Sequence, residues 1–215
     1  MPSEHAFYMK INDSGDLNIL LVCLYVNDLI FTSNNLKMIK DFKKSTMHEF
    51  EMTDLSLMSY FLGIKVVQRE DGIFICQKRY TTELLKKFHM QDCNSVRTLV
   101  EVGTKLSKNG EGMRIDSTYF KQIVGSLRYL RCTKPDISYG VGLISRFLES
   151  PRQSHMQVAK RIMRYLKGIY DHSLFYSLFN KCALIGYSDS DWGGDLDDCK
   201  STSGYCFIFG ATTYS

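Results

Sequence analysis

The neighbouring residues Asn27 and Asp28 are the first place in this chain where the residue types could do chemistry. They lie within residues 20–33, LLVCLYVNDLIFTS, between two apolar runs of the kind that form β-strands. A carboxylate exposed at a tight bend between strands can bind a metal ion. An ordinary hairpin predicts the same pattern, because Asn and Asp tolerate the positive φ angles of two-residue loops. The surrounding sequence has to separate a catalytic turn from a structural one.

A second set of carboxylates follows a predicted strand near the end of the sequence, where residues 183–198 carry five aspartates and no basic residue. Asp189 stands at the end of that strand. A calcium loop is one interpretation of the other four, but Trp192, Gly193 and Gly194 break the alternating ligand pattern and no glutamate follows at the required place. An exposed acidic turn is the other interpretation. The four residues are Asp191, Asp195, Asp197 and Asp198.

The basic residues are concentrated in the middle of the chain. The net charge is only +4, yet residues 121–170 hold ten basic side chains and two acids. Such a segment suits a polyanion, whereas the acidic end suits a cation. One predicted helix, 154–166, carries part of this charge opposite its apolar side. Its basic side either is solvated or contacts phosphates, through Lys160, Arg161, Arg164 and Lys167.

Bulk composition excludes several classes of protein. The chain has 215 residues, 44% hydrophobic and 23% charged, which is ordinary for a globular protein. No run of about 18 apolar residues is present and the start, MPSEHAFYMK, lacks a signal-peptide core, so neither a membrane span nor export is expected. The predicted location is intracellular, cytoplasmic or nuclear. Seven cysteines without a CxxC pair predict reduced, mostly buried thiols rather than disulfides or a zinc site.

The elements that must position these residues alternate between strand and helix in the first part of the chain. Apolar patterning predicts strands at residues 6–9, 17–25, 29–32, 60–68 and 73–76. Asn34 or Asn35 can cap a helix that ends near Glu49. The inner side of that helix is predicted to carry Leu36, Ile39, Phe42 and Met47. A second helix at 80–88 precedes a polar segment, 92–112, which is the best candidate for a linker although its apolar residues indicate that it packs.

The pattern then becomes helical before it returns to strands. Helices are predicted at 118–131, 136–148 and 154–166, separated by Pro135 and Pro151, and together they predict a compact subdomain. Short β-type runs follow at 173–176, 184–188 and 204–209. We expect these three runs to be the opening antiparallel strands of another sheet, which looks unfinished at Ser215.

Five segments in one order resemble the polymerase region of Ty1/copia-type retrotransposons, from the end of the reverse transcriptase to the start of its RNase H domain. They cover nearly the whole chain, and five collinear matches are far more specific than any one of them. The segments are CLYVNDLIFTSN, MTDLSLMSYFLGIKVVQREDGIFICQKRY, IVGSLRYLRCTKPDISYGVGLISRF, AKRIMRYLKG and YSDSDWGGDLDDCKSTSGYCF.

The resemblance implies an α+β fold in three parts. Residues 1–92 would form a partial palm, an antiparallel sheet with helices; residues 93–170 a helical, basic thumb or connection; and residues 171–215 the truncated start of an RNase H-like domain. The implied activity is RNA-directed DNA synthesis with Mg²⁺. The implied partner is an RNA:DNA hybrid or duplex nucleic acid, bound without sequence preference, and a separate polymerase fragment could complement the chain.

The resemblance also implies roles for single residues at the first hairpin. The family motif reads Tyr-Val-Asp-Asp, so Tyr25, Val26, Asn27 and Asp28 occupy the matching positions, the first two beside nucleic acid and Asp28 as a metal ligand. Two divalent ions about 4 Å apart need anionic oxygens, but Asn27 supplies a neutral amide. We therefore expect weakened metal binding and a polymerase rate lower by several orders of magnitude. A third acid, on an earlier strand of the family, has no counterpart in this sequence.

Further implied site residues lie downstream. Phe61, Leu62 and Gly63 match a hairpin that resembles a primer grip, where glycine lets the backbone approach nucleic acid; a buried strand with a bulge at Gly63 is the alternative. The helix with Lys160, Arg161, Arg164 and Lys167 would hold a duplex by its phosphates. Asp189 matches the first RNase H acid, and one carboxylate cannot organise two ions.

Other departures from the family pattern are consistent with a decayed copy. Leu99 stands where a proline is usual, Met156 where a tryptophan is usual, and the final residues GATTYS leave the expected course. The leading interpretation is a truncated, catalytically inactive reverse transcriptase fragment. The alternatives are a nonspecific nucleic-acid-binding module and a decayed gene fragment without a settled fold or role.

Overall fold

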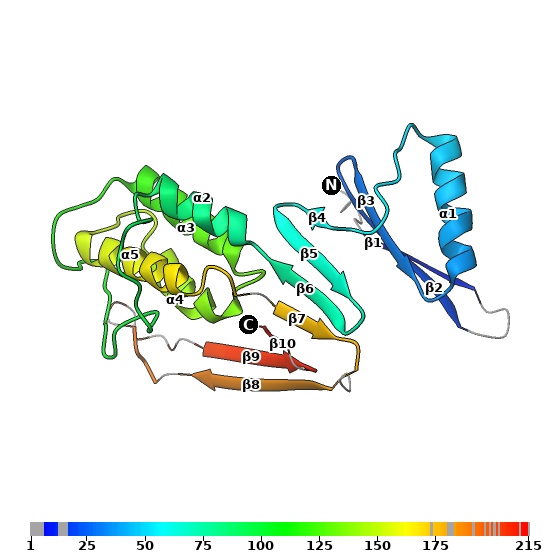
Figure 1. Ribbon diagram of the computed structural model, residues 1–215. Helices are drawn as coiled ribbons and strands as arrows, with labels where there is room; N and C mark the ends of the chain where they lie inside the picture. The colour runs from blue at the N-terminus through cyan, green and yellow to red at the C-terminus, as the bar shows by residue number, and fades with distance from the viewer. Residues whose placement is uncertain are drawn as a thin grey trace. The chain divides into compact units, whose positions relative to one another are not determined.

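A computed structural model describes residues 7–12, 17–172, 174–179, 183–190, 192–195, 197, 199, 201, 203–210 and 212–214 (Figure 1). The chain divides into two compact units, Met1–Met58 and Ser59–Ser215. The predicted boundaries at residues 92 and 170 both fall inside the second unit, and the three-part division stays a prediction. Each unit is described by itself.

The first unit is an antiparallel three-stranded sheet with one helix (Figure 1). Its strands β1 (Phe7–Asn12), β2 (Asn18–Tyr25) and β3 (Asp28–Ser33) lie in the order β1-β2-β3. Helix α1 (Leu36–Glu49) follows, and Asn35 is its N-cap, because the Asn35 side chain accepts from the Lys37 and Met38 amides at 2.9 and 3.4 Å. The predicted strands, helix and cap are thus confirmed, apart from up to three residues at their ends and Ala6, which lies outside the described residues.

The predicted inner side of α1 is only half right. Phe42 packs against Phe31 of β3 with the ring centroids 5.1 Å apart, and Ile39 is partly buried. Leu36 and Met47 are exposed, at 76% and 53%. A single helix on a narrow sheet has no second element to cover its ends, so α1 buries no residue fully. Among the described residues of this unit, Leu20 alone is a buried apolar side chain.

The second unit contains two sheets and a group of helices (Figure 1). The four-stranded sheet has the order β4-β5-β6-β7, made of β4 (Tyr60–Phe61), β5 (Ile64–Arg69), β6 (Gly72–Cys76) and β7 (Leu174–Ser177). The three-stranded sheet has the order β10-β9-β8, made of β10 (Thr212–Tyr214), β9 (Ser203–Phe209) and β8 (Leu184–Ser190). The helices are α2 (Lys78–Lys87), α3 (Ser117–Leu130), η1 (Pro135–Ile137), α4 (Ser138–Ser145) and α5 (Gln153–Gly168).

The prediction that β7 belongs to the same sheet as β8 and β9 is wrong. Strand β7 pairs with β6 instead, from Ile75↔Leu174 to Gly72↔Ser177. Phe175 stacks on Phe74 at 4.3 Å, a cross-strand aromatic pair that supports this register. Strand β10, which was not predicted, pairs with β9, and its buried Thr212 bonds to the Phe175 carbonyl. The predicted single strand 60–68 is likewise two strands, β4 and β5, so the bulged-strand alternative is wrong.

The core of the molecule lies among α2, α3, α4 and α5. Residues spaced by three and four on these helices are fully buried, including Phe120, Leu127, Ile144, Ile162 and Leu166. The segment 93–112 contains no helix or strand, but Leu106 is buried and Leu99 packs against the same cluster, as predicted. Gly140 permits this contact, since a Cβ there would lie 2.7 Å from Leu99 Cδ2.

Mixed helices and antiparallel sheets confirm the α+β class. No helix in the described part of the chain is long and apolar enough to cross a membrane. Six cysteines in the described part are free, and Cys182 lies outside it. The prediction that the thiols are mostly buried is wrong: Cys132 and Cys199 are exposed and the other four are partly exposed, because they lie on sheets with one open face and on loops.

Candidate functional site

The Asn27–Asp28 turn joins β2 to β3 as a two-residue hairpin. Tyr25 pairs with Asp28 across the ladder, so the loop residues are Val26 and Asn27 rather than Asn27 and Asp28. Asp28 therefore begins β3, and it is exposed at the tip of the hairpin together with Asn27. The structure thus presents one carboxylate and one amide to solvent at this turn.

The positive φ angle of this turn falls on Val26, at +53°, and not on Asn27 or Asp28 as expected. A β-branched residue in the left-handed region is an outlier, because its Cβ approaches the following carbonyl oxygen. Val26 is also 78% exposed, so packing does not offset this cost. Backbone strain of this kind gathers at functional sites, which makes the tip a candidate on physical grounds.

A second hairpin tip lies between β4 and β5, where Leu62 and Gly63 have φ angles of +46° and +77°. The Tyr129 hydroxyl, from α3, donates to the Leu62 carbonyl. A Cβ at Gly63 would lie 2.5 Å from that hydroxyl oxygen, so glycine is needed here for a protein contact. Tyr129 is itself held edge-on by Tyr80 at 4.7 Å, and partial burial raises its pKa. The tip at Leu62 and Gly63 is thus anchored to α3, and the primer-grip role of Phe61, Leu62 and Gly63 stays a prediction.

The predicted phosphate-binding side of α5 is partly engaged within the protein. Arg161 donates to Glu101 Oε1 at 2.5 Å and to Thr98 Oγ1 at 2.8 Å, and Arg164 donates to the Asn94 carbonyl at 2.8 Å. These bonds hold the segment 93–112 against the helix. Lys160 is exposed and Lys167 is partly exposed. Their contact with nucleic acid stays a prediction.

Asp189 lies on β8, paired with Gly204 of β9, and is exposed. Its Oδ1 accepts from the neighbouring Ser190 amide at 2.8 Å. In the described part of the chain, no group of three His, Cys, Asp or Glu side chains comes together as a metal site. Asp28 belongs to the first unit and Asp189 to the second, so each is assessed alone.

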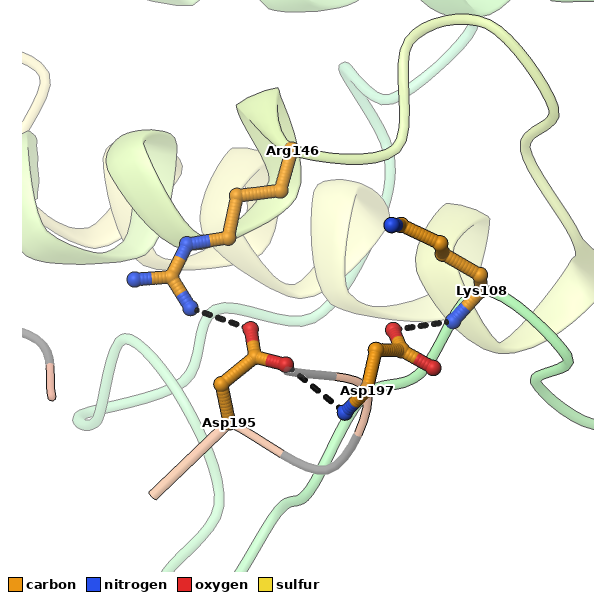
Figure 2. A network of polar contacts seen from close by, with 4 residues as sticks. All are labelled: Lys108, Arg146, Asp195 and Asp197. Carbon is orange, nitrogen blue, oxygen red and sulfur yellow. Dashed lines mark hydrogen bonds and ion pairs between the residues drawn. The ribbon is translucent and has the colours of Figure 1, made fainter. Parts of the chain in front are cut away.

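The acidic turn after β8 docks on basic and amide groups of the second unit (Figure 2). Asp195 Oδ2 forms an ion pair with Arg146 at 2.8 Å, and Asp197 Oδ2 accepts from the Lys108 amide at 2.7 Å. Asp195 Oδ1 also accepts from the Asp197 amide at 2.8 Å. Asp195 and Asp197, two of the four aspartates considered for a calcium loop, therefore have protein partners, whereas Asp191 and Asp198 lie outside the described residues.

This contact was missed by the sequence analysis, although its signal was present. The basic middle and the acidic end were each assigned an external partner, whereas opposite charges in one chain also attract one another. Which acid meets which base depends on the fold, because Arg146 and Asp195 are far apart in sequence.

Comparisons with known proteins agree with the resemblance. A family model described as "Reverse transcriptase (RNA-dependent DNA polymerase)" matches residues 1–102. The Pol polyproteins of transposons RE1 from Arabidopsis thaliana and TNT 1-94 from Nicotiana tabacum are 37% and 33% identical, over 90% and 89% of this chain. An uncharacterized mitochondrial protein of Arabidopsis thaliana is 33% identical, and the match covers 91% of this chain and 81% of that protein.

The chain spans 13% of the length of the RE1 polyprotein and 15% of the TNT 1-94 polyprotein. No solved structure matches it significantly.

Proposed function

We propose a function from the premise that this chain belongs to the reverse transcriptase family of copia-type retrotransposon Pol polyproteins. The chain holds an RNA:DNA hybrid or duplex nucleic acid by its phosphates, and it does not extend a primer. Residues 1–92 act as a partial palm, residues 93–170 as a thumb or connection, and residues 171–215 as the start of an RNase H-like domain. The α+β class and the collinear relatives support this assignment.

The proposed absence of primer extension is supported by the exposed pair of Asn27 and Asp28 at the tip of the β2–β3 hairpin. This family generally uses a divalent metal. Two hard cations held close together need several anionic oxygens, and the tip offers a single carboxylate. The donor set of this hairpin therefore does not fit a pair of metal ions. In the described part of the second unit, Asp189 likewise does not join two further acidic, His or Cys side chains in a metal-binding group.

The observation that supports strand binding is the basic surface of α5. Lys160 and Lys167 remain accessible beside the guanidinium groups that hold the segment 93–112. Accessible Lys side chains on one helix contact phosphates without reading bases, because a point charge carries no sequence information. Binding without sequence preference follows.

The test combines primer extension with a gel shift on an RNA:DNA hybrid. We expect no extension with Mg²⁺, and an affinity that falls linearly with salt on a logarithmic scale, by about 0.7 to 0.9 for each phosphate contacted. Replacing both lysines, Lys160→Gln and Lys167→Gln, should make the salt dependence of the affinity shallower, by the contribution of about two phosphate contacts.

The matched control replaces two exposed lysines of α1, Lys40→Gln and Lys44→Gln, which changes the net charge equally. Primer extension by the unaltered chain would refute the proposed inactivity. Binding that is absent, insensitive to salt, or weakened equally by both pairs of substitutions would refute the role of α5.

A further inference from the structure

A pocket of about 940 Å³ lies in the second unit, and Arg146, the partner of Asp195, is one of its lining residues. Its walls come from the end of α3, from η1 and α4, and from β9 and β10. The volume is within the range of small-molecule sites, about 300 to 1,000 Å³. The lining residues that matter to the argument are Arg128, Arg131, Lys134, Tyr139, Arg146 and Tyr205.

The pocket is strongly cationic. Four basic side chains line it against one carboxylate, Asp136, and that carboxylate already accepts from the Tyr165 hydroxyl at 2.6 Å. Tyr165 has its pKa raised to about 12 by burial and by Asp136, so its hydroxyl keeps the proton that it donates. The lining therefore favours an anion.

Lys134 is the least accessible of the four cations, at 2% exposure. Its Nζ donates to the Ile169 and His172 carbonyls at 2.6 and 3.3 Å, which accounts for two of the three donors of an ammonium group. Burial lowers the pKa of Lys134, because a buried charge loses its hydration. An anion in the pocket would add to the counter-charge that Asp136 and Asp171 already supply to Lys134.

The three arginines offer planar donor forks at the same pocket. Arg128 is exposed and donates through Nε to Ser145 Oγ at 3.2 Å. Arg131 is exposed at the C-cap of α3. Arg146 is shared with Asp195, which lies beside it in Figure 2. A guanidinium fork donates two parallel hydrogen bonds that match the spacing of two phosphate oxygens. A monatomic anion cannot accept both bonds in this way.

Two tyrosines add a surface for an aromatic ring. Tyr139 on α4 and Tyr205 on β9 both line the pocket and are 56% and 59% exposed. Exposed aromatic side chains stack on nucleobases, which contributes about 1 to 3 kcal/mol per base in known complexes. The ligand that uses both features carries a phosphate and a flat ring.

We propose that this pocket binds a nucleoside phosphate, with the phosphate at the exposed Arg128 and Arg131 and the base against Tyr139 or Tyr205. Asp195 competes with the phosphate for Arg146, so the acidic turn limits the affinity. The site is separate from the strand-binding lysines of α5, and it binds a free nucleotide whether or not the chain holds a strand.

Isothermal titration of the full chain with ADP, adenosine and inorganic phosphate tests this assignment. We expect ADP to bind more tightly than either part alone. Arg131→Gln should weaken ADP about tenfold or more, as expected for a lost charge-assisted hydrogen bond. Lys121→Gln, on the same helix but outside the pocket, should leave the affinity within about twofold.

Two further variants separate stacking from charge and test the competitor. Tyr139→Ala should weaken ADP and leave inorganic phosphate unchanged. Asp195→Asn should tighten ADP, because the carboxylate charge that competes with the phosphate for Arg146 is removed. Three results would each overturn the proposal. The first is an affinity for ADP no higher than that for inorganic phosphate, and the second is an equal loss of ADP affinity in Arg131→Gln and Lys121→Gln. The third is binding of a short single-stranded oligonucleotide without binding of ADP. If the chain fails to shift the RNA:DNA hybrid, that result counts only against the proposed strand binding by α5.

Discussion

At the scale of single residues, both hairpin tips that match the family place a bulky side chain in the left-handed region. Val26 occupies it at +53° and Leu62 at +46°. Such angles persist only where the surrounding structure or a function favours them. At Leu62 the Tyr129 hydroxyl supplies a protein contact, whereas Val26 is largely exposed. Packing therefore accounts for the φ angle at Leu62 better than for the φ angle at Val26.

Restoring the second acid of the turn should raise its affinity for divalent ions. In Asn27→Asp two adjacent carboxylates face solvent, and hard-cation affinity rises with the charge of the ligand set. We expect Mn²⁺ to bind the tip about tenfold more tightly, measured by paramagnetic broadening of amide signals from residues 25–28. Asn18→Asp, which adds the same charge elsewhere in this unit, is the control, and equal broadening at the tip in both variants would contradict the charge argument.

Relieving the backbone strain at Val26 should stabilise the first unit. Asn adopts the left-handed conformation more readily, so Val26→Asn is expected to raise the free energy of unfolding by about 1 kcal/mol in urea titrations. Val102→Asn, at a fully exposed position without a positive φ, should change stability by less than about 0.5 kcal/mol. A neutral or destabilising effect of Val26→Asn would show that the tip is not strained.

At the scale of elements, α5 is first a structural helix and only then a binding surface. Its apolar side is buried in the core, and Arg161 and Arg164 bind the segment 93–112. Its N-terminus is closed by His155, whose Nδ1 accepts from the Arg152 amide at 3.0 Å while Nε2 lies 3.0 Å from the Ser107 carbonyl. The ring also stacks on Phe147 at 4.0 Å. Both contacts fit the neutral tautomer with the proton on Nε2.

This arrangement predicts a loss of stability in mild acid. Burial is the main cause that lowers the pKa of His155 below its ordinary value, and Arg152 lowers it further. The unfolded chain therefore binds a proton at His155 first as the pH falls below about 6.5, and stability decreases until the pH passes the lowered pKa. Above about pH 6.5 the contribution is fully present. Urea titrations between about pH 8 and pH 5 measure it.

The control for this prediction is His155→Gln, which keeps an acceptor for the Arg152 amide and does not titrate. It should be less stable at neutral pH and should lose less stability between about pH 6.5 and pH 5. An unchanged pH slope in that variant would assign the effect to another group.

At the scale of the whole molecule, the two units have very unequal cores. In the described residues of the first unit only Leu20 is a buried apolar side chain, while the second unit buries a continuous cluster across four helices. Stability follows buried apolar area, so the first unit has little of its own. The large cluster argues against a chain without a settled fold.

The units should therefore open separately. Native-state hydrogen exchange is expected to show amides of β2 and β3 exchanging well before those of α3 and α5, at lower denaturant concentrations. Leu127→Ala should speed exchange in the helices while leaving the hairpin unchanged, since the substituted side chain lies in the second unit. One cooperative transition shared by both units would contradict this division.

Local patterns were sufficient to predict most elements of this chain. Alternation and i, i+3, i+4 spacing placed β2, β3 and the helices α1 to α5 within a few residues, because burial on one side imposes a period on the sequence. The Asn35 cap and the Pro135 boundary follow from equally local chemistry. The resemblance of the turn at Asn27 and Asp28 to the family motif was also visible in the sequence alone, because collinear motifs stay recognisable after substitution at single positions.

Long-range pairing decided the rest. The amino-acid sequence determined most of the strands and helices, which residues could be catalytic and which charge each segment carries, because these depend on neighbours along the chain. Only the tertiary structure decided that β7 joins β6, that Asp195 meets Arg146, and that Arg128, Arg131 and Lys134 share a pocket with Tyr205. Each of these contacts joins residues far apart in sequence, and their partners are selected by packing that no local pattern records.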